Sequence, residues 1–159
     1  MSIQQVRDYF RPLGREGDIL EFPTSSATVE LAAQALGVIP ARIAKTLSFL
    51  VEEHAVLIVC AGDAKVDNSR FKAQFHCKAK MLSHDQVPEL VGHEVGGVCP
   101  FGVKEGVQVY LDESLRRFDT VFPAAGSGNS AIQLTCDELE EYSRSLGWID
   151  VCKGWREEE

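Results

Sequence analysis

Three short stretches of the chain carry residue types suited to binding or polarising an acyl or phosphate group. The first is the loop GGVCPFG, residues 96–102, with three glycines and one proline. Gly96 and Gly97 can adopt a left-handed backbone and let another group approach closely, while Pro100 restricts the loop. Amides in such a loop can converge on an anion or a polarised carbonyl. A plain structural turn has the same composition, so the residues alone leave both interpretations open.

The second stretch is centred on Lys45, and the third is PAAGSGNS, residues 123–130, another loop of small residues. The neighbours of Lys45 in sequence are mostly apolar or small. A lysine at a strand end is usually a surface residue. In an apolar setting its ammonium group could instead enter a pocket and hold a phosphate, carbonyl or ribose oxygen.

Cys99 stands inside the glycine loop, where a thiolate would be a nucleophile. That chemistry needs a base within hydrogen-bond reach, and His93 is the nearest histidine in sequence. The alternatives are a Cys99 that only fills space and a His93 that lies exposed at a helix end. The sequence favours these structural roles for both residues.

Composition limits the class of protein. The 159 residues, 45% hydrophobic and 25% charged, suit one soluble globular domain spanning 1–159. No apolar run is long enough to span a membrane and the N-terminus lacks a signal-peptide core, so we expect a cytoplasmic protein. The five cysteines form no CxxC pair, so we expect free thiols, no metal and no cofactor.

Charge argues against extensive contact with duplex nucleic acid. The net charge is −8, whereas proteins that grip DNA are usually basic. This balance is compatible with a pocket for a single RNA end. Residues 63–80 hold five basic and two acidic side chains, and this segment either faces phosphate or is a solvated surface.

The elements that position these stretches follow from hydrophobic periodicity and capping residues. Two apolar runs, Ile43–Val51 and Ala55–Gly62, are separated by a short polar break and predict the central β-hairpin. Thr135 followed by Glu138 predicts a capping box that starts the last helix, with Leu146 on its inner face and Gly147 at its end. The other predicted helices are 3–13, 29–36, 68–76 and 85–91. The other predicted strands are 18–22, 107–111, 120–122, 131–134 and 148–151, and residues 78–82 are expected to be either a short strand or an extended link. The tail from Lys153 is expected to fray.

These elements predict an α/β (α+β) fold. Because several strands follow one another through hairpins and short turns, the sheet is expected to be mixed or largely antiparallel rather than doubly wound. The two small-residue loops and Lys45 would then lie at strand ends.

The ordered set RIAKTLSF with Lys45, GGVCPFG and PAAGSGNSAIQL resembles the YbaK/EbsC family. That family includes free-standing aminoacyl-tRNA deacylases and the editing insertion domain of bacterial prolyl-tRNA synthetase. The resemblance implies a mixed six- or seven-stranded sheet curled toward a barrel with flanking helices. It also implies a pocket between the sheet and the glycine loop, and hydrolysis of the ester between an amino acid and a tRNA 3′ end.

The resemblance also assigns roles to residues. Lys45 matches the family's essential lysine and would orient the terminal adenosine or its phosphate. Amides of Gly97, Val98 and Cys99 would stabilise an oxyanion, in a loop whose GxxxP pattern is matched by Gly96 and Pro100. The second loop would contact the amino acid or position water through Gly126, Ser127, Gly128, Asn129 and Ser130. The implied partner is a tRNA 3′ end that carries an amino acid, and an aminoacyl-tRNA synthetase stays open as a second partner. Neither DNA nor a membrane is expected as a partner.

Other interpretations stay open. One is a binding module that holds a tRNA end, a nucleotide or a synthetase without turnover. Another is a hydrolase that uses Cys99. In parts of the family a substrate group, such as a cysteine thiol, attacks the ester itself, which would explain the lack of a Ser-His-Asp order.

Overall fold

A computed structural model describes residues 2–156, and its central feature is a mixed six-stranded sheet curled into a half-barrel. The strand order is β8-β6-β2-β3-β5-β9. Its strands are β2 (Ile43–Val51), β3 (His54–Ala61), β5 (Gln108–Asp112), β6 (Thr120–Pro123), β8 (Leu134–Thr135) and β9 (Trp148–Ile149). Two small antiparallel sheets lie beside it, formed by β1 (Leu20–Glu21) with β7 (Ser130–Ala131) and by β4 (Lys65–Val66) with β10 (Cys152–Lys153). The predicted α/β fold with a mixed sheet is confirmed.

The predicted hairpin of β2 and β3 forms the centre of the sheet. Its antiparallel register runs from Ala44 opposite Ala61 to Val51 opposite His54. Glu52 and Glu53 make the turn with positive φ values of 49° and 69°, as a two-residue hairpin turn requires. Every residue of β3 after His54 is buried, because helices or loops cover both faces of this strand.

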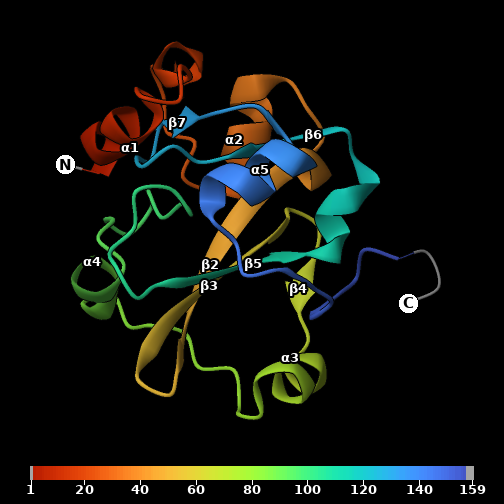
Figure 1. Cartoon of the computed structure of the whole chain (residues 1–159). Helices are drawn as coiled ribbons and strands as arrows, with labels where there is room; N and C mark the ends of the chain where they lie inside the picture. Colours follow the sequence, from red (N-terminus) through yellow and green to blue (C-terminus); the bar gives the residue numbers. More distant parts are fainter. Residues whose placement is uncertain (1, 157–159) are drawn as a thin grey trace.

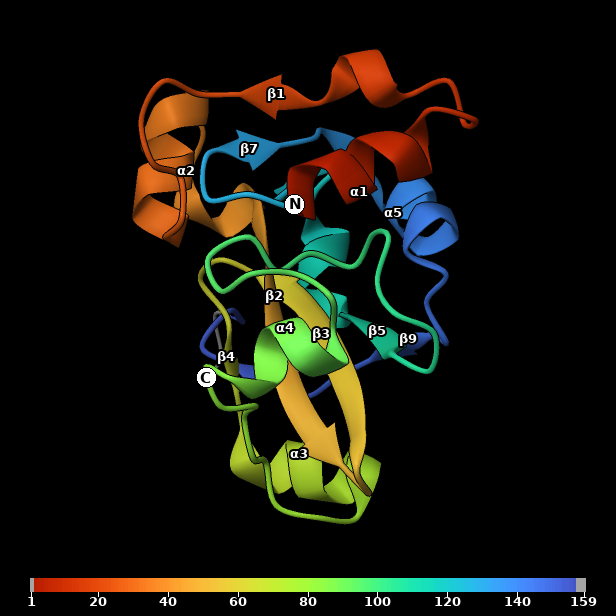
Figure 2. The same cartoon turned by 90° about the vertical axis from the view of Figure 1, so that its left-hand side faces the viewer.

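Five α-helices and three short 3-10 helices surround the sheet. The α-helices are α1 (Ser2–Phe10), α2 (Val29–Leu36), α3 (Asn68–Phe75), α4 (Gln86–Leu90) and α5 (Cys136–Ser143). The 3-10 helices are η1 (Glu16–Asp18), η2 (Pro40–Arg42) and η3 (Glu113–Arg117). Figures 1 and 2 place α1, α2 and α5 at one end of the molecule and α3 at the other. The described residues include no helix long and apolar enough to cross a membrane.

Caps fix where the helices beside the site begin and end. Thr28 accepts the Leu31 amide at 3.2 Å and starts α2, and Gly37 ends it with φ +69°. The predicted capping box of Thr135 and Glu138 is present at α5. The helix stops at Ser143, earlier than predicted, because Arg144 takes the left-handed conformation, and Leu146 is 61% exposed rather than part of an inner face.

The outer edge of β2 is covered by two different segments. At its start, β6 pairs in parallel with Ile43 and Ala44. Further along, residues 80–82 pair with it: Leu50 donates to Lys80 O at 2.8 Å, and Leu82 donates to Ser48 O at 3.1 Å. Figure 2 shows the segment that leads into α4 passing over this part of the hairpin. The edge between the two pairings is left open.

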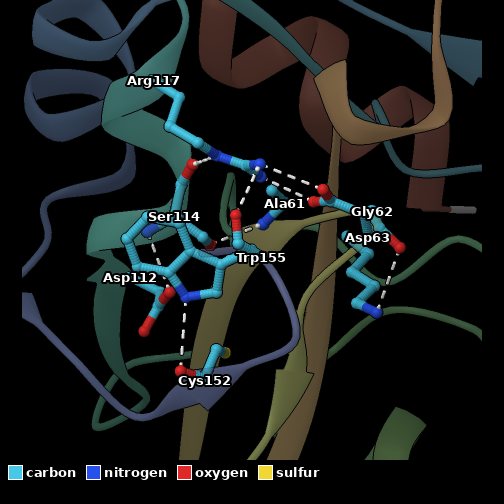
Figure 3. A network of polar contacts seen from close by, with 9 residues as sticks. Ala61, Gly62, Asp63, Asp112, Ser114, Arg117, Cys152 and Trp155 are labelled. Carbon is cyan, nitrogen blue, oxygen red and sulfur yellow. Dashed lines mark hydrogen bonds and ion pairs between the residues drawn. The ribbon is translucent and has the colours of Figure 1, made fainter. Parts of the chain in front are cut away.

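A polar network holds the far end of β3 (Figure 3). Arg117 makes two hydrogen bonds to the Asp63 carboxylate, at 3.0 and 2.6 Å, and Ser114 Oγ accepts the Ala61 amide at 3.1 Å. These contacts flank Gly62. A side chain there would be obstructed, since an added Cβ would lie 2.1 Å from Pro40 O. The position of the Gly62 carbonyl is therefore well defined.

Two further sequence predictions of local structure are wrong. The expected strand 131–134 is split, because Ser130–Ala131 pairs with β1 whereas Leu134–Thr135 pairs with β6. The apolar pattern there reports burial and cannot say which strand is the partner. The tail does not fray at once either, since β10 pairs with β4 and Trp155 donates from Nε1 to Cys152 O at 3.2 Å. Residues 157–159 lie outside the described part of the chain.

Candidate functional site

A cavity of about 500 Å³ opens where the outer edge of β2 is uncovered. Lys45 from β2, Gly96 and Val98 from the glycine loop, and Ser130 from the second loop all line it. Most of the remaining wall is apolar and comes from α2, β2, β6 and the segment around α4. The larger apolar side chains are Val29, Ile43, Leu47, Met81, Val87 and Phe122. None of the described residues that line the cavity is acidic.

Lys45 is partly buried, and its ammonium group has one weak contact. Nζ donates to Gly62 O at 3.4 Å, the carbonyl positioned by the network in Figure 3. Within residues 2–156 no carboxylate forms an ion pair with Lys45. Its charge is therefore not neutralised by the protein and is available to an anionic or strongly polar ligand.

The glycine loop packs directly on the second loop. Gly97 is buried, and a Cβ added there would lie 2.7 Å from Gly126 O and 2.9 Å from Ser127 Cα. Gly97 donates its amide to Glu94 O at 3.0 Å, so that amide is used to close a turn. The amides of Val98 and Cys99 have no acceptor among the described residues. Of the three amides expected to face an oxyanion, these two remain available, and only Val98 lines the cavity.

The second loop is held by hydrogen bonds within itself and to the segment before α2. Ser127 Oγ lies 2.9 Å from Asn129 Oδ1 and 2.6 Å from Ser130 Oγ, in hydrogen-bond contact with both. Asn129 donates from Nδ2 to Phe22 O at 3.0 Å, and Gly128 O accepts the Ser26 amide at 2.7 Å. Of the five residues predicted to contact the substrate from this loop, Ser130 lines the cavity, and Gly126, Ser127, Gly128 and Asn129 do not.

The structure seals Cys99 from the cavity. Its thiol is fully buried and does not line the cavity, and burial raises its pKa to about 12. His93 is not at the surface, as the sequence suggested, but is only 1% exposed, with Nε2 3.6 Å from Cys99 Sγ. Pro100 is buried beside this pair.

The tautomer of His93 explains why this pair is not a catalytic dyad. Nε2 lies 2.7 Å from Phe101 O, and because a carbonyl can only accept, Nε2 carries the proton. It therefore cannot take a proton from Cys99. Burial also lowers the pKa of His93, which keeps the ring neutral. The buried pair therefore has a structural role in the glycine loop, and His93 does not stabilise a thiolate at Cys99.

Sequence reasoning missed several polar residues that line the cavity. They are Ser26, Thr28, Thr46, Ser48 and His84. Thr46 and Ser48 lie on the open edge of β2, a location that depends on pairing between segments far apart in the chain. Pattern reasoning on one strand cannot find such a site.

Comparison with known proteins identifies a family whose matched residues include those that line the cavity. Residues 24–142 match the aminoacyl-tRNA editing domain family, a range that includes Lys45 and both loops. The chain belongs to this family. The editing-domain identity confirms the family expected from the three motifs.

The editing domain has relatives of two kinds. It is 58% identical over 156 residues to the uncharacterized protein YwhH of Bacillus subtilis (strain 168), covering 98% of this chain and 99% of YwhH. It is 30% identical over 94 residues to the proline–tRNA ligase of Bacillus cytotoxicus, covering 58% of this chain but only 16% of the ligase.

Solved structures confirm the fold of the editing domain. A crystal structure of a proposed trans-editing enzyme for prolyl tRNA synthetase superposes with a TM-score of 0.86 and 28% identity, over 96% of this chain and 98% of that one. The hypothetical protein APE2540 superposes with a TM-score of 0.82 and 25% identity, over 94% and 99% of the two chains.

Proposed function

We propose that this editing domain hydrolyses the ester between a mischarged amino acid and the 3′ end of a tRNA, acting in trans as a deacylase. The observation that carries the proposal is that an unneutralised Lys45 and the loop bearing the free Val98 amide border one cavity. Family membership and the likeness to a proposed trans-editing enzyme support it. Such a substrate would place the protein in the cytoplasm, and a synthetase is a possible source of it.

The chemistry asked of the site is modest, because an aminoacyl ester is already activated. Water attacks the ester carbonyl carbon, the tetrahedral intermediate collapses, and the bond to the ribose oxygen breaks. The ribose oxygen takes the proton that water loses. The Val98 amide would stabilise the oxyanion, and Lys45 would hold the terminal adenosine or its phosphate so that the ester lies against the glycine loop.

A binding module without turnover is the second candidate. It is favoured by one observation: the described residues that line the cavity include no assembled pair of nucleophile and base. Such a protein would hold a tRNA end or a nucleotide in the same cavity.

A panel of mischarged tRNAs separates the two functions. We expect the purified protein to release amino acid from at least one tRNA and Lys45→Ala to lower kcat/KM by about 100-fold. Lys72→Ala, which changes an exposed lysine on α3, is the matched control and should keep wild-type turnover. Unchanged turnover in Lys45→Ala would show that the lysine assignment is wrong. Release of no amino acid across the panel would favour the binding module.

A further inference from the structure

The open part of the β2 edge presents main-chain groups without partners. In an antiparallel pair, alternate residues direct both main-chain groups away from the neighbouring strand. The bonds of Ser48 and Leu50 to residues 80–82 show that the even-numbered residues of β2 face away from β3. Thr46 has the same parity, so its N–H and C=O point out of the hairpin. β6 pairs no further than Ala44, and residues 80–82 begin at Ser48, so Thr46 lies between them.

Three groups on this edge lack a hydrogen bond within the described residues: the Thr46 N–H, the Thr46 C=O and the Ser48 N–H. Thr46 Oγ1 is also buried without a partner. Both residues line the cavity. A buried polar group without a partner is costly and uncommon, and unpaired main-chain groups on a strand edge bind an added strand. The buried Thr46 Oγ1 beside this open edge therefore indicates a place where a ligand completes the bonding.

The spacing of these groups matches one amino acid. When a parallel strand lies at an edge, the C=O of one residue and the N–H of the residue two further on bind the N–H and C=O of a single residue in that strand. Here those groups are the Thr46 C=O and the Ser48 N–H. A free α-amino acid ester carries both complements, an ammonium donor and a carbonyl acceptor, on adjacent carbons.

We propose that the aminoacyl group of the substrate occupies the open edge of β2 as a one-residue strand, with its α-ammonium group on Thr46 C=O and its ester carbonyl oxygen on Ser48 N–H. The second lone pair of that oxygen is left for the Val98 amide. This inference rests on the deacylase function proposed above. The main chain supplies the contacts, so they do not depend on the amino acid's side chain. That side chain would lie against the apolar wall, which would select by size.

A consequence for specificity follows. An acylated α-amino group has no positive charge and carries extra bulk on the nitrogen. The site would therefore reject peptidyl-tRNA and other N-blocked esters while accepting a free aminoacyl ester. The discrimination comes from strand-type pairing, the same contacts by which sheet edges bind extended peptides.

The test uses the whole protein labelled with 15N and 13C. The probe is 3′-amino-3′-deoxyadenosine acylated with the amino acid that the tRNA panel releases fastest, a non-hydrolysable amide. Its matched control has hydrogen in place of the α-amino group. We expect the probe to shift the Ser48 amide proton and the Leu47 nitrogen, which reports on the Thr46 carbonyl. The control should leave the Leu47 nitrogen unshifted, and Leu57 on β3 should not move with either compound.

Kinetics give a second measurement. We expect N-acetylation of the released aminoacyl-tRNA to lower kcat/KM by about tenfold or more, the loss of one charge-assisted hydrogen bond. Binding of the probe without a shift at Leu47 and Ser48, or equal turnover of the acetylated ester, would overturn this inference while leaving the deacylase function intact. A panel that releases no amino acid would overturn the function, and this inference with it.

Discussion

At the scale of single residues, Cys99 shows that a place in the glycine loop does not by itself give a residue a catalytic role. The thiol lies in the glycine loop but is fully buried, with a pKa raised to about 12 by burial. The neighbouring His93 Nε2 donates to Phe101 O and is not free to act as a base. The same type of residue in the same loop would be a nucleophile only if it faced the cavity and had a free base beside it.

Cys99→Ala should therefore retain turnover within about threefold and cost about 1 kcal/mol of stability, as expected for a small change in a packed core. Because the thiol stays protonated far above neutrality, the pH–rate profiles of wild type and variant should coincide between about pH 6 and 8.5. Deacylation across that range and denaturant unfolding measure the two effects, with Cys77→Ala as a control outside the loop. A 100-fold loss of turnover in a folded Cys99→Ala variant would restore the thiol mechanism.

At the scale of elements, the site depends on contact between two loops that are about 30 residues apart in sequence. Gly97 touches Gly126 and Ser127 with no room for a Cβ, so the glycine loop can reach the cavity only while the second loop is in place. The second loop is fixed in turn by Asn129 and Gly128, which bind the segment before α2. The cavity wall is thus assembled from segments that hold one another.

Gly97→Ala tests this contact. The added Cβ would lie 2.7 Å from Gly126 O, so the loops must separate, and displacement of the Val98 amide should lower kcat/KM by about 100-fold. Overpacking should also cost about 1–3 kcal/mol of stability. Gly17→Ala is the matched control, because nothing lies within 4 Å of its Cβ. Wild-type kcat/KM in Gly97→Ala would show that the loop contact does not position the catalytic groups.

Which elements could be predicted depends on whether their signal is local. The β2–β3 hairpin and the Thr135–Glu138 capping box were predictable, because a polar break between two apolar runs and the spacing of cap residues are each local features of the sequence. The split of residues 131–134 and the burial of His93 were not, since each depends on a partner distant in sequence. The open edge around Thr46 is harder still to predict from the sequence. It exists because β6 pairs with β2 only as far as Ala44 and residues 80–82 pair with it only from Ser48, and no residue pattern marks where such pairings stop. Lys45 and the two loops are distinguished by their residue types, whereas their roles come from the family resemblance and remain predictions.

At the scale of the whole molecule, charge limits how much RNA the protein can hold. The chain has 24 acidic and 16 basic residues and a net charge of −8. The cavity itself is lined by one lysine and no acid, so attraction to the RNA is concentrated at its end. Exposed Lys78 and Lys80 precede Met81 at the cavity and could add contacts to the acceptor stem.

This distribution of charge predicts that kcat/KM depends only weakly on salt concentration and on the parts of the tRNA beyond the acceptor stem. Each phosphate contact adds about 0.7–0.9 to the slope of log affinity against log salt, so two or three contacts give a slope of magnitude below about 3. We expect kcat/KM at subsaturating substrate to follow that slope, and an acylated acceptor-stem minihelix to react within about threefold of the full tRNA. Steady-state kinetics between about 50 and 200 mM salt measure both. A slope of about 6 or steeper, or loss of activity on the minihelix, would require an extended RNA surface. Because the net charge of the chain is −8, such a surface would have to be a local basic patch beyond the residues that border the cavity.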